Sequence, residues 1–192
     1  MLSTKNVEVK DTNKVSSYVN VGINKIKINH IDTKESSKGS YQVVFHVEGE
    51  PVTDPNFKGV DGAYGPVGRV TTSYLGNDSQ VKDFIDTVAL LSTKLGVKEQ
   101  VDAISASDVK SYVEQISPIL SGKYFHARVT GEEYAKATGG VGVNLHFSKF
   151  GAFASDSEGS EKLKPFDKTN KYDYKKVEAA PQGGSTVSEL SY

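Results

Sequence analysis

The chain contains no cysteine and no tryptophan, and only two of its basic residues are arginines. Without cysteine there can be neither a disulfide framework nor a thiolate metal site, which argues against a small secreted scaffold. The absence of tryptophan weakens the case for carbohydrate binding. Arg69 and Arg128 are the best bidentate phosphate donors if they lie on a binding face, and the alternative is an ordinary surface ion pair.

Long apolar runs are also absent. No apolar stretch reaches the roughly eighteen residues of a membrane span, and residues 1–14 carry charges where a signal peptide needs apolar residues. We therefore expect an intracellular protein without a membrane partner. The formal charge of -1 gives no overall attraction for nucleic acid. However, residues 76–118 hold four Lys against seven acids, and residues 120–176 hold ten Lys or Arg against seven acids. A basic face can therefore exist within a neutral total.

The order of the predicted elements is the strongest structural signal. Alternation of apolar and polar residues predicts strands at Val21–Ile31, Tyr41–Glu48, Val67–Leu75, Lys123–Thr130 and Val141–Ser148. Residues 78–121 instead show helical spacing. Three strands, a helical insert and two further strands are the layout of an OB fold, whose curved face typically binds single-stranded nucleic acid or oligosaccharide. We expect a mainly β protein with a five-stranded OB-like barrel and helices between strands three and four.

The insert is expected to hold two helices. Asn77 or Asp78 is a suitable cap for the first, and Ser105 or Ser107 for the second. The 192 residues fit one domain with appendages. The predicted parts are a flexible N-terminal arm (1–20), the OB-fold domain (21–153), a basic and aromatic extension (154–176) and a flexible tail (177–192). The extension is either a strand-tracking surface or a docked segment.

The strand faces suggest where a ligand binds. Ile26 and Ile28 alternate with Lys25 and Lys27, so the lysines are expected to face outward. Lys34 and Lys38 make the tip of the first hairpin basic. In residues 123–130, Phe125, Ala127 and Val129 are expected inward, and three planar side chains outward: Tyr124, His126 and Arg128. The alternative is an amphipathic strand whose outer face is covered. Phe57 and Tyr64 lie in a loop rich in glycine and proline, where they either stack on bases or fold over the core.

Catalytic and metal-binding motifs are not apparent. The four histidines fall on four different predicted strands without ligand spacing: His30, His46, His126 and His146. Nucleophile elbows, phosphate loops and dinucleotide fingerprints are missing. We therefore expect no enzyme, no cofactor and no bound metal.

Several segments resemble the single-stranded DNA-binding proteins of tailed bacteriophages. They are VGINKIKINHIDTKESSKGSYQVVFHVEGEPV, GPVGRVTTSYL, LSTKLGVKEQ and LSGKYFHARVTGEEY, within residues 20–150. The resemblance implies an OB-fold protein that binds single-stranded DNA with little sequence preference during phage replication or recombination, in the cytoplasm of the infected host.

The candidate DNA-binding residues are Lys25, Lys27, Lys34, Lys38, Tyr64, Arg69, Tyr124, His126, Arg128, Lys149 and Phe150. In the family, an acidic tail with a terminal aromatic recruits replication proteins. Here the only acidic groups of residues 177–192 are Glu178, Glu189 and the terminal carboxylate, although Tyr192 supplies the terminal aromatic ring. The oligomeric state is left open. The alternative function is a phage structural or protein-interaction protein without a nucleic-acid ligand, which the neutral charge, scarce arginine and acidic insert favour.

Overall fold

The computed structural model describes residues 19–51, 68–149, 151–167 and 169–177. The strands are β1 (Gly22–Glu35), β2 (Tyr41–Pro51), β3 (Arg69–Thr71), β4 (Tyr124–Ala135), β5 (Val141–Phe147), β6 (Phe153–Ser155) and β7 (Tyr174–Lys175). The helices are α1 (Asp78–Lys94), α2 (Lys98–Asp102) and α3 (Val109–Leu120), and a single 3-10 turn follows β6 at Ser160–Lys162. The predicted order of three strands, a helical insert and further strands is confirmed.

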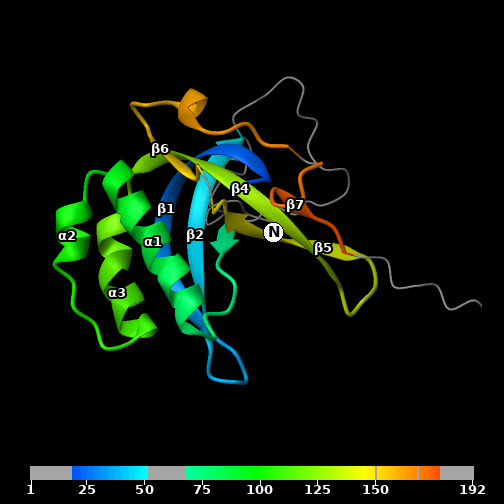
Figure 1. Ribbon diagram of the computed structural model, residues 1–192, viewed down its shortest axis with the longest axis horizontal. Helices are drawn as coiled ribbons and strands as arrows, with labels where there is room; N and C mark the ends of the chain where they lie inside the picture. The colour runs from blue at the N-terminus through cyan, green and yellow to red at the C-terminus, as the bar shows by residue number, and fades with distance from the viewer. Residues whose placement is uncertain (1–18, 52–67, 150, 168, 178–192) are drawn as a thin grey trace, which may run out of the picture.

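The strands form one sheet in the order β3-β2-β1-β4-β5, and β6 and β7 also pair with β4 (Figure 1). All these pairs are antiparallel except β4 with β7. The two end strands of this order, β3 and β5, lie close to one another. The Thr71 hydroxyl of β3 donates to the Leu145 carbonyl of β5 at 3.4 Å, and His146 Nδ1 of β5 lies 2.6 Å from the Thr71 carbonyl oxygen. Since these contacts involve side chains and no backbone ladder joins β3 to β5, the described residues form an open sheet of seven strands. The predicted mainly β class is confirmed.

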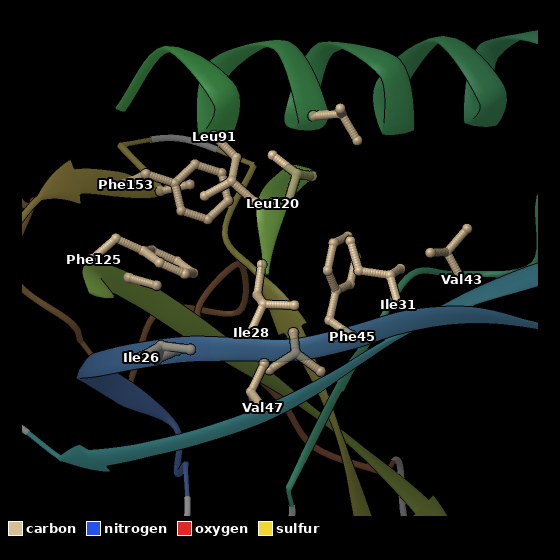
Figure 2. Close-up of a cluster of buried hydrophobic side chains, with 14 of the residues drawn as sticks. Ile26, Ile28, Ile31, Val43, Phe45, Val47, Leu91, Leu120, Phe125 and Phe153 are labelled. Atoms are coloured by element: carbon tan, nitrogen blue, oxygen red, sulfur yellow. The ribbon is translucent and has the colours of Figure 1, made fainter. Parts of the chain in front are cut away.

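The hydrophobic core lies between the inner face of the sheet and the helices. Figure 2 shows Ile28 and Phe45 of the sheet beneath Leu91 of α1 and Leu120 of α3. Phe147 packs edge-on against two further rings, Phe45 at 5.1 Å and Phe153 at 5.0 Å between centroids. Burial of each large apolar side chain contributes about 1.5–3 kcal/mol, so this cluster fixes the helices against the sheet.

A β-bulge at Asn29 changes which β1 residues face the core. Before the bulge Ile26 and Ile28 are buried, whereas after it Ile31 is buried and His30 is exposed. An extra residue in one strand reverses the period-two pattern beyond it. The predicted inward positions Phe125, Ala127 and Val129 are buried as expected. Val141 is 47% exposed, because it begins β5 next to the hairpin tip.

The helical insert contains three helices rather than the two expected. Asn77 caps α1 by accepting from the Gln80 N–H at 3.0 Å, as predicted. The cap of α3 is Asp108, which accepts from the Ser111 N–H at 2.8 Å, so the predicted serine caps are wrong. Ser107 instead donates to the Asp108 carboxylate. A carboxylate at this position also interacts favourably with the helix dipole.

The third strand is shorter than predicted. Its ladder ends at Thr71, because the hydroxyl of Thr72 accepts from the Val43 N–H at 3.0 Å in place of a strand carbonyl. A single bridge between Tyr41 and Leu75 marks the end of the expected segment. No helix among the described residues is both long and apolar enough to cross a membrane.

The segment after residue 153 belongs to the same sheet. β6 pairs with β4 through Phe125, and β7 pairs with it through Gly131. Leu163 and Tyr174 of this segment are buried. Of the two interpretations of the extension, the described part of it is therefore docked (Figure 1).

Candidate nucleic-acid interface

The outer face of β1 and β4 carries an exposed aromatic ring close to two lysines. Tyr124 lies opposite Lys27 in the β1/β4 ladder and is 46% exposed. The ammonium of Lys25 lies 5.3 Å from the centroid of the Tyr124 ring, and that of Lys27 lies 5.5 Å from it. Both distances are within the range of cation–π attraction. The three side chains, each of which was predicted to face outward, therefore lie close together.

Two carboxylates share this surface, which we call the Tyr124 patch and define as Lys25, Lys27, Glu48, Tyr124 and Asp156. Lys25 pairs with Asp156 at 2.7 Å, and Lys27 pairs with Glu48 across the β1/β2 ladder. The hydrogen bond to Glu48 raises the pKa of Lys27, against the opposing effect of desolvation. The carboxylates thus hold both ammonium groups close to the Tyr124 ring, but they also compensate the charge of the two lysines.

His126 and Arg128 lie on the outer side of β4 as predicted, but the prediction that they are accessible is wrong. Arg128 is 3% exposed because the C-terminal segment covers the outer face of β4. Its guanidinium donates to the Ser148 hydroxyl at 2.7 Å and to the Asp173 carboxylate. His126 is buried opposite Ala154 of β6, and its Nδ1 has no hydrogen-bond partner. Neither side chain is placed to reach a phosphate in this structure.

The remaining basic candidates are exposed but lie in different places. Lys34 ends the outer face of β1, and Lys38 lies in the five-residue tip between β1 and β2. Arg69 lies opposite His46 in the β2/β3 ladder, so that β2 separates it from β1. Lys149 instead pairs with Asp83 of α1 at 2.9 Å, across a groove. Of the candidate rings, Tyr64 and Phe150 lie outside the described residues, as does Phe57.

A histidine pair on the same outer face was not anticipated. His30 and His46 are directly opposed across β1 and β2, and their rings stack at 4.0 Å with an interplanar angle of 11°. Asp32 joins them, with its carboxylate 3.0 Å from His46 Nε2 and 3.9 Å from His30 Nε2. We call these three residues the His30 cluster. If residues of β1 and β2 are paired one by one outward from the hairpin tip, residue 30 falls opposite residue 46. This pairing was the feature of the sequence from which the histidine pair could have been predicted.

A groove of about 560 Å³ separates α1 from the ends of β3 and β5. Its floor is apolar and includes Phe45, Phe84 and Phe147, whereas Asp83 and Lys149 lie at its edge. Lys149 therefore lies at this groove and not on the Tyr124 patch.

Comparison with known proteins does not assign a family. The chain matches no protein-family profile, and a search of curated proteins gives no significant match.

Proposed function

We propose that this protein is an OB-like single-stranded DNA-binding protein with little sequence preference, acting in phage DNA replication or recombination. The observation that carries the proposal is the exposed Tyr124 ring with the ammonium groups of Lys25 and Lys27 close to it on the outer face of the sheet. An aromatic face accepts any base, and neighbouring cations hold the phosphates on either side. In this protein the aromatic ring and the two lysines lie together on one β surface, which supports the proposal.

The path of a bound strand follows from the exposed cations. From the Tyr124 patch the outer face of β1 leads to the His30 cluster and then to Lys34, with Arg69 beside it on β3. Strands rise about 3.3 Å per residue, so the ten positions from Lys25 to Lys34 cover about 30 Å, enough for several nucleotides. The helices α1 and α3 pack against the inner face and do not lie on this path, whereas the carboxylates of Asp32, Glu48 and Asp156 do and would have to exchange their partners for a bound strand.

The direct test is fluorescence anisotropy of a labelled single strand of about 30 nucleotides, compared with duplex DNA and RNA at two salt concentrations. Tyr124→Ala is expected to weaken single-strand binding by about 5- to 150-fold, the range given by 1–3 kcal/mol per stacked base. The double substitution Lys25→Gln with Lys27→Gln is expected to lower the salt dependence by about 0.7 per lost phosphate contact.

Lys82→Gln is the matched control, because Lys82 is an exposed lysine of α1 that pairs with Asp86 away from the patch. Its substitution should leave DNA affinity and its salt dependence close to those of the parent. Absence of single-strand binding at low salt would refute the proposal. Equal binding by the parent and the Tyr124→Ala protein would remove the patch from the site.

The groove beside α1 supports a second candidate function, that of an interaction or structural protein. Its apolar floor is bordered by Leu90, which is 41% exposed. Apolar grooves of this kind receive helices or extended segments of partner proteins. Sedimentation equilibrium separates the two functions, because an assembly protein is expected to form discrete large oligomers without DNA. Recruitment of replication proteins by residues 177–192 also stays a prediction, and residues 178–192 lie outside the described residues.

A further inference from the structure

Two histidines and an aspartate lie close together on the outer face of the β1/β2 hairpin. His30 Nε2 and His46 Nε2 both face the carboxylate of Asp32, and the three donor atoms lie within 4.8 Å of one another. The histidines come from facing positions of two strands, and Asp32 is two residues after His30 on the same face. We propose that the His30 cluster binds a divalent transition-metal ion of the zinc type.

The spacing of the donor atoms is close to that required by such an ion. Zinc binds imidazole nitrogen and carboxylate oxygen at about 2.0–2.2 Å, so two ligands of a tetrahedral ion lie about 3.3–3.5 Å apart. The Asp32 oxygen is 3.0 Å from one nitrogen and 3.9 Å from the other. The stacked rings must tilt toward a common ion by rotation about their χ angles, and the 28–56% exposure of the three side chains leaves room for this without disturbing the core.

The backbone supplies the preorganisation. The bulge at Asn29 turns His30 and Asp32 outward, and the β1/β2 ladder then places His30 opposite His46. Strand pairing therefore fixes all three Cα positions before any ion binds, which limits the ordering cost to three side chains. Two imidazoles and one carboxylate suit Zn²⁺, Co²⁺, Ni²⁺ or Cu²⁺ better than Mg²⁺ or Ca²⁺, which prefer oxygen ligands.

Charged side chains of both signs surround the His30 cluster. The carboxylate of Asp32 brings negative charge to the cluster, and Glu48 is the next outward residue on β2 after His46. Arg69 is the partner of His46 across the β2/β3 ladder and carries opposing positive charge. Three protein ligands leave one tetrahedral position for water or another small ligand. The site does not depend on the proposed DNA-binding function.

The absence of cysteine makes the experiment easy to interpret, because no thiolate can compete for the ion. The full chain is freed of metal with a chelator and titrated with Zn²⁺ alone, in competition with a chromophoric chelator. Co²⁺ then reports ligand geometry through its visible absorption. One equivalent of Zn²⁺ per chain and a tetrahedral Co²⁺ spectrum are the expected results.

Three variants remove the ligands one at a time: His30→Gln, His46→Gln and Asp32→Asn. Each is expected to weaken Zn²⁺ binding at least about tenfold, since loss of even an outer-shell partner costs 10–100-fold. The matched controls are His126→Gln and His146→Gln, which remove the other two histidines of the chain. These controls should retain the parent affinity if they remain folded.

Histidine ring NMR of the parent protein gives a test that is independent of variant folding. Addition of Zn²⁺ should shift the ring resonances of His30 and His46 and leave those of His126 and His146 in place. No stoichiometric binding, unchanged affinity in the folded ligand variants, or shifts confined to His126 or His146 would each overturn the proposal.

Discussion

Arg128 of β4 and Asp173 of the C-terminal segment form an ion pair that is almost fully buried, with both side chains 3% exposed. The pair is supported by neighbours, because Ser148 accepts from the Arg128 guanidinium and the Asp167 N–H donates to the Asp173 carboxylate at 2.9 Å. It connects residues 45 positions apart in the chain. The contact explains why the segment after β6 is docked although it is rich in lysine.

Removing one member of this pair should strongly destabilise the fold. Asp173→Asn leaves the buried guanidinium of Arg128 without a counter-charge, and such changes cost about 3–5 kcal/mol. Urea unfolding measures the loss. The double variant Arg128→Met with Asp173→Asn should lose less than the sum of the two single variants, because it leaves no unpaired charge. Additive losses would show that the two residues do not interact energetically.

The carboxylates of the Tyr124 patch are expected to compete with phosphate for the lysines. Glu48→Gln and Asp156→Asn should therefore strengthen single-strand binding by about 1.5- to 5-fold each, the range expected for exposed ion pairs. Anisotropy at low salt measures the change. Asp86→Asn on α1 removes the same charge from the exposed pair with Lys82 and is the control. An equal gain in the control would mean that only net charge matters.

The contact between Lys94 and Glu158 should make stability depend on acid pH. Hydrogen bonds from Lys94 and from the Ser155 N–H lower the pKa of Glu158 from 4.5 to about 2. Because the folded-state pKa is depressed, the stabilisation is fully present above the unfolded value and is lost as the pH falls from 4.5 toward about 2. Glu158→Gln should thus be less stable than the parent at pH 7, as measured by urea unfolding at several pH values.

The difference between the parent and Glu158→Gln should shrink progressively below pH 4.5, where the unfolded chain begins to bind the proton. A difference that stays constant from neutral to strongly acidic pH would contradict this account. Lys82→Gln, which breaks an exposed pair within α1, provides a comparison for the loss of a surface lysine.

Gly131 should not tolerate even a methyl group. A Cβ at this position would lie 2.6 Å from Val21 Cγ1 and 2.9 Å from the ring of Tyr174. Because both neighbours are buried, Gly131→Ala is expected to cost about 1–3 kcal/mol in the free energy of unfolding. Gly76→Ala is the control, since its Cβ would meet the nearest atom at 3.5 Å. Equal thermal stability of the two variants would refute the close packing of β7 on β4.

The predictable parts of the fold are those that depend on local periodicity. The alternation around Ile26 and Phe45 indicated two strands, and apolar spacing around Val88 indicated α1. The same patterns placed Lys25, Lys27 and Tyr124 on an outer face, where the structure also has them.

The errors have a common origin in contacts between distant segments. The alternation of side chains along a strand predicts the face on which Arg128 lies, but it does not predict whether another segment covers that face. The bulge at Asn29 and the pairing of His30 with His46 both depend on the register of β1 with β2. Ligand spacing along the sequence could not reveal that pair because its members belong to separate strands.

The sequence by itself determined the order of strands and helices, the principal core faces and the cap of α1, because each depends on residues only a few positions apart. Only the tertiary structure decided that Arg128 is buried, that β6 and β7 complete the sheet on β4, and that three potential metal ligands meet on one hairpin. These features depend on which segments pack together, and the free energy of that packing is shared among residues far apart in the chain.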